Sequence, residues 1–257
     1  MCKIKYLNDE VIKKALAKDN PVIRKYVARL ISDTTGIPYE EIEGKLELLY
    51  PEVSVNKNVV NSEVDLVFKE GYTYFNIEIN YGRSSSLKKK NYTYALQLGL
   101  RDIKNAKEYN KGNKVVQINI NAFDPYGYGE LVYKSRMLVE KYNIIHNDLI
   151  TIYDLNLDYF EKIPYNEIER ERLLKDLAIF VVEEKEVLSN LYEGDKIMEE
   201  MKQEMDHYLN PLDSILFYNK EDLQRQIEEE MAEKGEMKSK IEIAKKMLFK
   251  NEPIEKI

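Results

Sequence analysis

The chain has 257 residues, of which 44% are hydrophobic and 33% charged, and its formal net charge is −7. This composition is typical of a globular protein, and the acidic balance argues against a general nucleic-acid-coating protein, which needs a basic footprint. The longest uninterrupted apolar run, 177–182, is far shorter than the roughly 20 residues that a membrane helix needs. The N-terminus has no secretion-signal pattern, so we expect a cytoplasmic protein.

Cysteine and histidine are scarce, which restricts the kinds of metal site. A single cysteine, Cys2, cannot form an internal disulfide. The two histidines, His146 and His207, are isolated and cannot build a Cys/His zinc site. Any bound metal must therefore be held by oxygen ligands.

The first predicted elements are two helices. Apolar residues recur at helical spacing over 9–34, and the pattern breaks at Asn20 and Pro21, which suit an N-cap and a first helical position. A short acidic helical turn is expected over 38–44. The following segment, 45–55, is compatible with either a strand or an irregular stretch.

The strongest local pattern is a β-hairpin over 62–80, SEVDLVFKEGYTYFNIEIN. A turn at Glu70 and Gly71 pairs positions that sum to 141, which puts Glu78 one diagonal step from Asp65. A turn shifted by one residue pairs positions that sum to 143, which puts the two acids directly opposite each other. Either register predicts one face with Val64, Leu66, Phe68, Phe75, Ile77 and Ile79, and another with Asp65, Val67, Tyr74, Asn76, Glu78 and Asn80.

Further elements follow the hairpin in an order that indicates the fold class. We expect a helix over about 87–109, a strand over 114–123, and further strands over 130–139 and 149–157. A crossover helix covers one face of a sheet and lets the next strand insert beside an earlier one. The order hairpin, helix, strand therefore predicts an α/β fold with a mixed sheet.

The composition changes near residue 163, where helical patterns begin to dominate. We therefore expect an α/β domain over 1–162 and a helical, charged C-terminal region over 163–257. The last stretch, EDLQRQIEEEMAEKGEMKSKIEIAKKMLFK, has acids and bases in balance. That balance favours a surface helix or loose coiled-coil strand over a nucleic-acid-binding arm.

Two acids on one face of the hairpin suggest a metal site. Carboxylates on adjacent strands can hold Mg²⁺, which takes oxygen ligands and keeps waters for a phosphate substrate. Asp65 and Glu78 are the candidate ligands, and the backbone carbonyl of Ile79 is a candidate third oxygen. A bound Mg²⁺ activates a water and neutralises charge on a scissile phosphate. The plainer interpretation is that both acids are exposed residues on the solvated face of a hairpin.

The stretch SEVDLVF…FNIEIN resembles the active-site hairpin of the PD-(D/E)XK nuclease superfamily, specifically the PD-(D/E)XK nuclease family transposases, or recombination-promoting (Rpn) nucleases. NDEVIKKAL resembles the N-terminal helix of that family, with Asp9 and Lys13 in the matching places. YTYALQL, VVQININAF and KSKIEIAKKMLFKNEPIEKI resemble its later segments in the same order. The resemblance implies a restriction-endonuclease-like fold with Asp65 and Glu78 as metal ligands, and Asn80 in the place of the usual lysine or glutamine.

Asn80 is the main departure from the family pattern. An amide can orient a water or a phosphate, but it cannot be the cation that a lysine is. Lys88, Lys89 and Lys90 could supply a cation from the next helix. Arg83 could contact phosphate from the loop before it. Each of these four is also compatible with a solvated surface charge.

A further acid could reach the metal from the segment before the hairpin. Glu47 is the candidate, and Glu41 and Glu43 compete with it for that role.

The leading functional hypothesis is a Mg²⁺-dependent endonuclease that hydrolyses phosphodiester bonds in DNA, with Mn²⁺ or Ca²⁺ as other candidate metals. The alternative is a catalytically inactive nuclease-fold protein that binds or assembles through its helical C-terminal region. A third hypothesis is a structural interaction protein with both acids on the surface. A homodimer is plausible for the nuclease, because cutting both strands of a duplex with one metal site per chain favours two chains.

Overall fold

The computed structural model describes residues 9–18, 20–49, 65–103, 112–182 and 184–209. Contacts within the chain define two compact units, Met1–Pro211 and Leu212–Ile257, and all described residues belong to the first. The helical pattern predicted for the last stretch of the chain lies outside these ranges. Within the described ranges, no helix is both long and apolar enough to cross a membrane.

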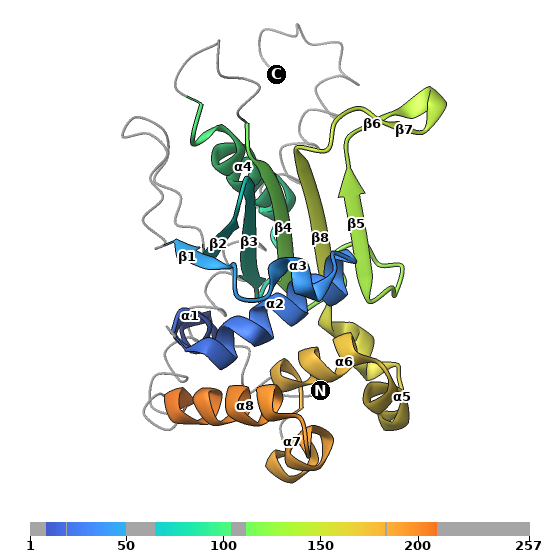
Figure 1. Ribbon diagram of the computed structural model, residues 1–257. Helices are drawn as coiled ribbons and strands as arrows, with labels where there is room; N and C mark the ends of the chain where they lie inside the picture. The colour runs from blue at the N-terminus through green and yellow to red at the C-terminus, as the bar shows by residue number, and fades with distance from the viewer. Residues whose placement is uncertain (1–8, 19, 50–64, 104–111, 183, 210–257) are drawn as a thin grey trace, which may run out of the picture. The chain divides into compact units, whose positions relative to one another are not determined.

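A mixed six-stranded β-sheet forms the centre of the first unit, with helices flanking it (Figure 1). In sheet order its strands are β1 (Glu47–Leu49), β2 (Leu66–Glu70), β3 (Thr73–Asn80), β4 (Lys114–Asn121), β8 (Ile150–Asn156) and β5 (Val132–Arg136). β3, β4 and β8 run parallel, and the remaining neighbours are antiparallel. The predicted α/β class with a mixed sheet and flanking helices is confirmed.

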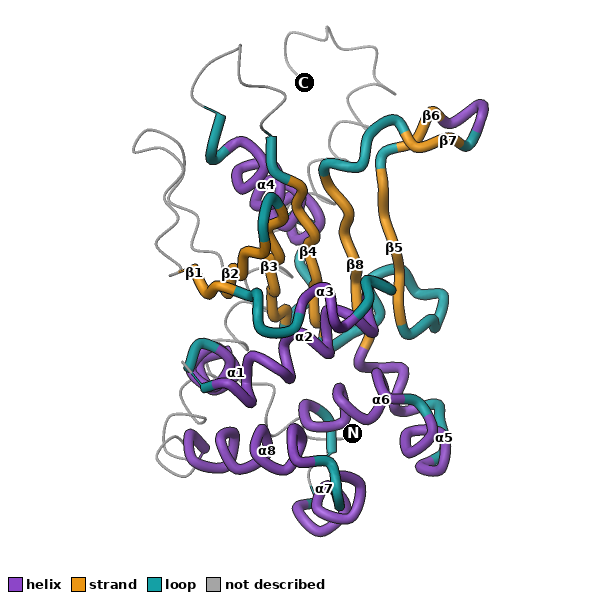
Figure 2. Tube along the Cα trace, viewed as in Figure 1, coloured by secondary structure: helices purple, strands orange, loops and turns teal. Residues whose placement is uncertain are grey.

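Helices precede, interrupt and follow the sheet in the chain (Figure 2). The α-helices are α1 (Asp9–Leu16), α2 (Pro21–Thr35), α3 (Tyr39–Ile42), α4 (Leu87–Leu100), α5 (Tyr165–Arg170), α6 (Arg172–Leu177), α7 (Lys185–Tyr192) and α8 (Lys196–Leu209). Short 3-10 helices are η2 (Glu140–Tyr142), η3 (Leu157–Glu161) and η4 (Ala178–Phe180). β6 (Leu138–Val139) and β7 (Ile144–Ile145) form a separate two-stranded hairpin.

The start of α2 confirms the predicted cap. The side chain of Asn20 accepts a hydrogen bond from the N–H of Val22 at 2.8 Å, and Pro21 occupies the first helical position. By contrast, α4 ends at Leu100, before the predicted end near residue 109, and residues 104–111 lie outside the described ranges.

The hairpin adopts the shifted register. Glu70 pairs with Thr73, so the turn consists of Gly71 and Tyr72, and of the two predicted turns the shifted one is observed. Gly71 has a positive φ of 54°, which glycine adopts without the steric cost of a Cβ at the first position of a two-residue hairpin turn. Paired positions therefore sum to 143, and Asp65, directly before β2, lies opposite Glu78.

The apolar face of the sheet packs against α2. The guanidinium carbon of Arg24 lies 5.3 Å from the centre of the Phe68 ring, and the hydroxyl of Tyr153 donates to the carbonyl of Thr35 at 3.3 Å. Leu66, Ile77 and the other hydrophobic residues predicted for this face of β2 and β3 are buried. α2 therefore covers the face that the alternation pattern assigned to the core.

The opposite face is covered by α4, so the middle of the sheet is buried on both sides. At one end an apolar cluster joins this helix to the sheet; its buried members are Val67, Tyr74, Ala95, Leu98 and Val115. Towards the carboxyl ends of β3, β4 and β8 the same face becomes polar, and its buried side chains are Asn76, Glu78, Asn80, Gln117, Asn119, Asn121, Asp154 and Asn156. The candidate site lies where the face changes from apolar to polar.

The later helices belong to the same compact unit as the sheet. Arg29 on α2 pairs with Asp176 on α6 at 2.6 Å, and Lys18 pairs with Glu204 on α8 at 2.6 Å. Three methionines on one side of α8 are fully buried, namely Met198, Met201 and Met205. Contacts divide the chain after Pro211, and not after residue 162 as the change in composition suggested.

Candidate active site

Asp65 is a nearly buried carboxylate held between two donors. Its side chain accepts a hydrogen bond from the N–H of Ile79 at 2.9 Å through Oδ2. Its Oδ1 lies 2.6 Å from Nζ of Lys13, which comes from α1. Only 8% of Asp65 is exposed. Its two oxygens are thus engaged by the neighbouring strand and by the N-terminal helix.

Glu78 lies near the carboxyl end of β3 and has no exposed surface. Its Oε1 accepts hydrogen bonds from the backbone N–H of Asp65 at 3.2 Å and from Nδ2 of Asn76 at 3.1 Å. Its Oε2 is buried without a hydrogen-bond donor, although Nζ of Lys90 lies 3.8 Å away. A lysine ammonium group thus lies near each acid, and Oε2 of Glu78 still lacks a hydrogen bond.

This environment changes the protonation of Glu78. Burial raises its pKa from 4.5 to about 7, and the adjacent negative charge of Asp65 adds to the increase. Lys90 and the hydrogen bonds from Asp65 and Asn76 act in the opposite direction and offset the increase only in part. Without a further cation, Glu78 thus titrates near neutral pH.

A chain of amide side chains runs from Glu78 across the sheet. Nδ2 of Asn76 also donates to Oε1 of Gln117 at 3.0 Å, and Nε2 of Gln117 donates to Oδ1 of Asn119 at 2.9 Å. Nδ2 of Asn119 then donates to Oδ1 of Asp154 on β8 at 2.8 Å. These bonds restrict the rotamers of residues on three neighbouring strands. Gln117 and Asn119 each use both their donor and their acceptor, whereas Asn76 donates twice and its Oδ1 accepts no hydrogen bond.

Asn80 belongs to a second row of amides. Its Nδ2 donates to Oδ1 of Asn121 at 3.0 Å, and Nδ2 of Asn121 in turn contacts the carbonyl of Leu155 at 3.2 Å. Asn80 is 4% exposed. The structure therefore places this residue in the same face as Glu78, two positions along the strand, with its donor directed at the neighbouring strand.

The residues fit a hard cation in donor chemistry. Oε2 of Glu78 and Oδ1 of Asn76 are buried oxygens without a hydrogen-bond donor. In the described ranges, no three acidic, histidine or cysteine side chains gather as a metal cluster. The carboxylate pair of Asp65 and Glu78 fits the habit of Mg²⁺, which commonly binds one or two carboxylates together with waters and substrate phosphates.

Of the basic residues predicted for the site, Lys90 alone lies against an acid of the pair. Lys88 points elsewhere, with Nζ 3.9 Å from the centre of the Tyr126 ring. Lys89 is exposed on α4. Arg83 lies in the loop before that helix, where its guanidinium is 4.0 Å from the carboxylate of Asp158.

The predicted further acid is not brought to the pair. Glu47 is exposed on β1 and pairs with Lys69, four residues along β2 from Asp65. Four strand residues correspond to roughly 13 Å. The competing Glu43 lies near Lys25 at 3.8 Å, and Glu41 is exposed on α3.

The interpretation of both acids as solvent-exposed residues is wrong, because Glu78 is fully buried and Asp65 nearly so. Reasoning from alternation missed this, since a row of Asn and Glu residues is typical of a wet face. It also missed Asn76 as a hydrogen-bond donor to Glu78, and the amides of β4 that continue the chain from Asn76. The available signal was the repetition of amides at alternate positions in NIEIN and QININ, the two strands that lie side by side.

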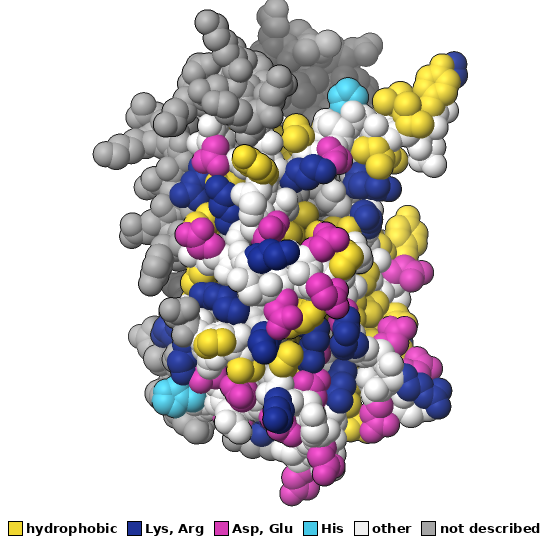
Figure 3. All heavy atoms as spheres, viewed as in Figure 1, with side chains coloured by type: hydrophobic (Ala, Val, Ile, Leu, Met, Phe, Trp, Pro, Cys, Tyr) yellow, Lys and Arg dark blue, Asp and Glu magenta, His cyan; other side chains and the backbone are white. Residues whose placement is uncertain are grey.

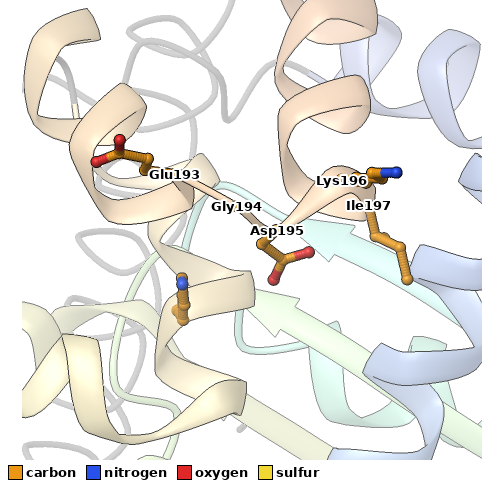
Figure 4. Close-up of a pocket in the computed structure, with 6 residues that line it drawn as sticks. Glu193, Gly194, Asp195, Lys196 and Ile197 are labelled. Carbon is orange, nitrogen blue, oxygen red and sulfur yellow. The ribbon is translucent and has the colours of Figure 1, made fainter.

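Acidic and basic side chains are intermixed on the face of the molecule that Figure 3 shows. A separate pocket of about 560 Å³ lies at the turn between α7 and α8 (Figure 4). Asp195 in this pocket already accepts hydrogen bonds from Arg29 at 3.0 and 3.1 Å and from the N–H of Met198 at 3.3 Å. The carboxylate of Asp195 therefore has a structural role, because it holds α2 and the start of α8 together.

Comparisons with family models, with curated proteins and with solved structures gave no match to this chain. The functional argument therefore depends on the geometry of the Asp65 and Glu78 pair and on the motifs in the sequence.

Proposed function

We propose that the protein is a metal-dependent DNA endonuclease of the PD-(D/E)XK transposase or Rpn type, with a restriction-endonuclease-like fold. The observation that supports it most is the pair of Asp65 and Glu78, opposed across a hairpin and buried, with one Glu78 oxygen lacking a donor. A fold tolerates two adjacent buried acids when a cation compensates them. The proposal accounts for an arrangement that a purely structural hairpin does not need.

Asp65 and Glu78 would hold Mg²⁺, or Mn²⁺ or Ca²⁺ in its place, with the carbonyl of Ile79 as a candidate third oxygen. When bound, the metal supplies an activated water and neutralises charge on the phosphate. The N–H of Ile79 and the amide of Asn76 orient the two carboxylates through the bonds at 2.9 and 3.1 Å. Asn80 would orient a water or a phosphate oxygen rather than supply charge.

Lys13 and Lys90 would supply the positive charge that Asn80 cannot. Their ammonium groups lie 2.6 Å and 3.8 Å from the carboxylates of Asp65 and Glu78. With both carboxylates engaged by a metal, the ammonium groups of Lys13 and Lys90 would be available to contact a phosphate oxygen. Lys90 is 42% exposed in its side chain and can make this contact at the surface.

One observation favours the alternative of an inactive binding module. Both oxygens of Asp65 are engaged, by Lys13 and by the N–H of Ile79, and the donor of Asn80 is used by Asn121. In that case Lys13 would replace the metal as a permanent internal cation. The two functions differ in whether a divalent cation displaces this lysine.

The deciding experiment is nicking of supercoiled plasmid by the full chain with Mg²⁺, with Mn²⁺ or with EDTA. We expect cleavage that requires metal, and a loss of about 100-fold or more in Asp65→Ala and in Glu78→Ala, because metal catalysis contributes several kcal/mol. Asp148→Ala is the matched control, since this acid is exposed and forms a surface ion pair with Lys114. It should retain full activity.

Lys90→Ala and Lys89→Ala form a second matched pair on the same helix turn. The first should lower cleavage by about tenfold or more, as expected for one lost charge contact in the transition state, and the second should leave it unchanged. Absence of cleavage with every metal, from protein shown by circular dichroism to be folded, would contradict the nuclease proposal and favour the inactive module.

A further inference from the structure

The loop between β4 and β5, residues 122–131, is held in a fixed shape by one carboxylate. Asp124 accepts hydrogen bonds from the N–H groups of Tyr126, Gly127 and Gly129 at 3.0, 2.8 and 2.7 Å. The hydroxyl of Tyr133 donates to the same side chain at 2.8 Å. The backbone around two tyrosines is therefore organised in advance of any ligand.

The two tyrosines of this loop have different roles. Tyr126 packs against Tyr133 with ring centres 4.8 Å apart and carries Nζ of Lys88 over its ring at 3.9 Å. Tyr128 is 81% exposed and presents a large flat ring to solvent on a rigid loop. An exposed aromatic ring in a fixed loop is the kind of platform on which an unpaired base stacks.

Three cations surround this loop and come from three separate segments. Lys88 belongs to the first turn of α4, and Arg83 lies over the ring of Phe123, with its guanidinium carbon 5.5 Å from the ring centre. Nζ of Lys162 lies close to Gly129, 3.1 Å from the place where a Cβ on that glycine would stand. Their charge suits a phosphate backbone that follows the platform, despite the acidic net charge of the chain.

Tyr126, two residues before Tyr128 in the same loop, lies close to the acid pair. The register places Glu78 opposite Asn119 and Asn119 opposite Asp154, and the hydroxyl of Tyr126 donates to Asp154 at 3.1 Å. Two strand spacings amount to about 10 Å. The first turn of α4 makes the same connection, because Lys88 reaches Tyr126 and Lys90 reaches Glu78. A short stretch of one strand can therefore contact both places.

The exposed ring of Tyr128 favours an unpaired strand over a duplex. Tyr128 is 81% exposed, so a base can stack on its face. A stiff duplex keeps its bases paired and stacked on one another, and it offers no free base face to this ring. An unpaired strand does, since its bases can be splayed onto an aromatic side chain.

We propose that Tyr128, together with Arg83, Lys88 and Lys162, forms a binding platform for unpaired nucleotides, so that the substrate is single-stranded or locally unpaired DNA. This inference rests on the proposed function for the identity of the ligand as DNA. The platform itself stands on the exposed ring, its rigid loop and the three cations around it. It assigns specificity to a loop that contains none of the candidate metal ligands.

The test is equilibrium binding of a fluorescein-labelled single-stranded oligonucleotide and of a blunt duplex of the same sequence, in EDTA so that no cleavage intervenes. We expect the single strand to bind at least several-fold more tightly than the duplex, and Tyr128→Ala to weaken single-strand binding about tenfold, the effect of losing one stacked base. Tyr128→Phe should bind as the wild type does, because stacking needs the ring and not the hydroxyl.

Tyr72→Ala is the matched control. Tyr72 is 82% exposed, but it lies in the hairpin turn at the opposite end of β3, so its removal should leave binding unchanged. Equal binding by wild type and Tyr128→Ala, or equal affinity for duplex and single strand, would overturn the platform. A direct readout is quenching of 2-aminopurine in the oligonucleotide, which should be lost in Tyr128→Ala.

The outcomes separate this inference from the nuclease proposal. Single-strand binding that depends on Tyr128, without cleavage in any metal, supports the platform and contradicts the nuclease. Metal-dependent cleavage of duplex that is indifferent to Tyr128→Ala supports the nuclease and overturns the platform.

Discussion

A glutamate without exposed surface destabilises a fold unless its charge is compensated or its proton is retained. Both apply to Glu78, each only in part. Lys90, 3.8 Å away, compensates some of its charge, and burial raises the pKa of Glu78 to about 7, so that it keeps its proton at lower pH. Its remaining cost is typical of a functional site, where local stability is lower than the sequence could provide. A cation that binds there should therefore stabilise the protein.

This cost can be measured through the pH dependence of stability. The folded state keeps the Glu78 proton up to a pKa of about 7, whereas the unfolded chain releases it near 4.5. Between these values the unfolded state binds fewer protons, so the free energy of unfolding falls by about 3 kcal/mol as pH rises. We expect Glu78→Gln to match the wild type near pH 4.5 and to exceed it by about 2 to 3 kcal/mol at pH 8 in EDTA.

Urea unfolding at both pH values measures the difference. Glu47→Gln on β1, the edge strand beyond β2, is the control, because that side chain is exposed and the substitution should be neutral at either pH. An unchanged pH profile in Glu78→Gln would mean that another group is responsible for the dependence.

At this scale the sequence predicts the identity of the acids better than their surroundings. Once the position of the turn is known, the register of the hairpin places Asp65 opposite Glu78. Lys13 entered only through the family resemblance, because 52 residues separate it from Asp65 and no local pattern links them. A helix and a strand that meet across such a separation are joined by tertiary packing, which periodicity does not encode.

Among the elements, the loop of residues 122–131 depends most clearly on one side chain, the carboxylate of Asp124. Burial raises the pKa of Asp124, but donors from Gly127, Gly129, Tyr133 and Tyr126 outweigh it and lower the pKa to about 2. The carboxylate is thus ionised at all working pH values, and its stabilisation is lost only as pH falls from about 4 towards 2.

Asp124→Asn should destabilise the protein by about 2 kcal/mol, because an amide has one acceptor oxygen where the carboxylate has two and lacks the charge. Thermal unfolding at pH 7 measures this effect. Asp148→Asn, which disrupts only the exposed pair with Lys114, should cost less than about 1 kcal/mol. A similar cost for both substitutions would show that the loop is not held by Asp124.

Element boundaries were predictable where a specific residue marks them. Asn20 and Pro21 fixed the start of α2, because cap chemistry is local. The hairpin turn was displaced by one residue, because the sequence shows that Gly71 is in the turn but not which of the two turn positions it takes. The observed φ of 54° at the first position resolves that choice.

For the molecule as a whole, Arg29 connects parts of the chain that the composition appeared to separate. Its Nε and Nη2 donate to Asp176 at 2.7 and 2.6 Å, and its Nη1 donates to Asp195 at 3.1 and 3.0 Å. Arg29 is 7% exposed and Asp176 is fully buried. One guanidinium thus ties α2, α6 and the turn before α8 into a single unit with the sheet.

Arg29→Met should destabilise the protein by about 3 to 5 kcal/mol, because it leaves the buried charge of Asp176 unpaired. The double variant Arg29→Met with Asp176→Leu should recover most of that loss, since an apolar pair of similar volume avoids desolvation. Urea unfolding at pH 7 distinguishes the two. If the double variant is as unstable as the single one, the ion pair itself, and not the unpaired acid, is what stabilises the junction.

The composition change near residue 163 suggested a domain boundary, but a helix-rich segment is not necessarily a separate compact unit. The helices after it bury apolar side chains such as Met198 and Met201 within the same unit as the sheet. Such long-range packing is decided by which faces meet in space, and a single sequence without those contacts indicates only that the faces exist.

The matching alternation of β3 and β4 has a consequence for how the chain folds. A slip of two residues between NIEIN and QININ would still pair isoleucine with isoleucine, and would leave only amides and Glu78 to face one another. The central residues of β3 and β4 therefore specify the register between the two strands only weakly. What rejects a slipped pairing is the apolar end, where Tyr74 and Val115 would be forced beside polar residues under α4. We therefore expect slipped registers of β3 and β4 to be excluded only late in folding, when α4 packs against the apolar end of the sheet.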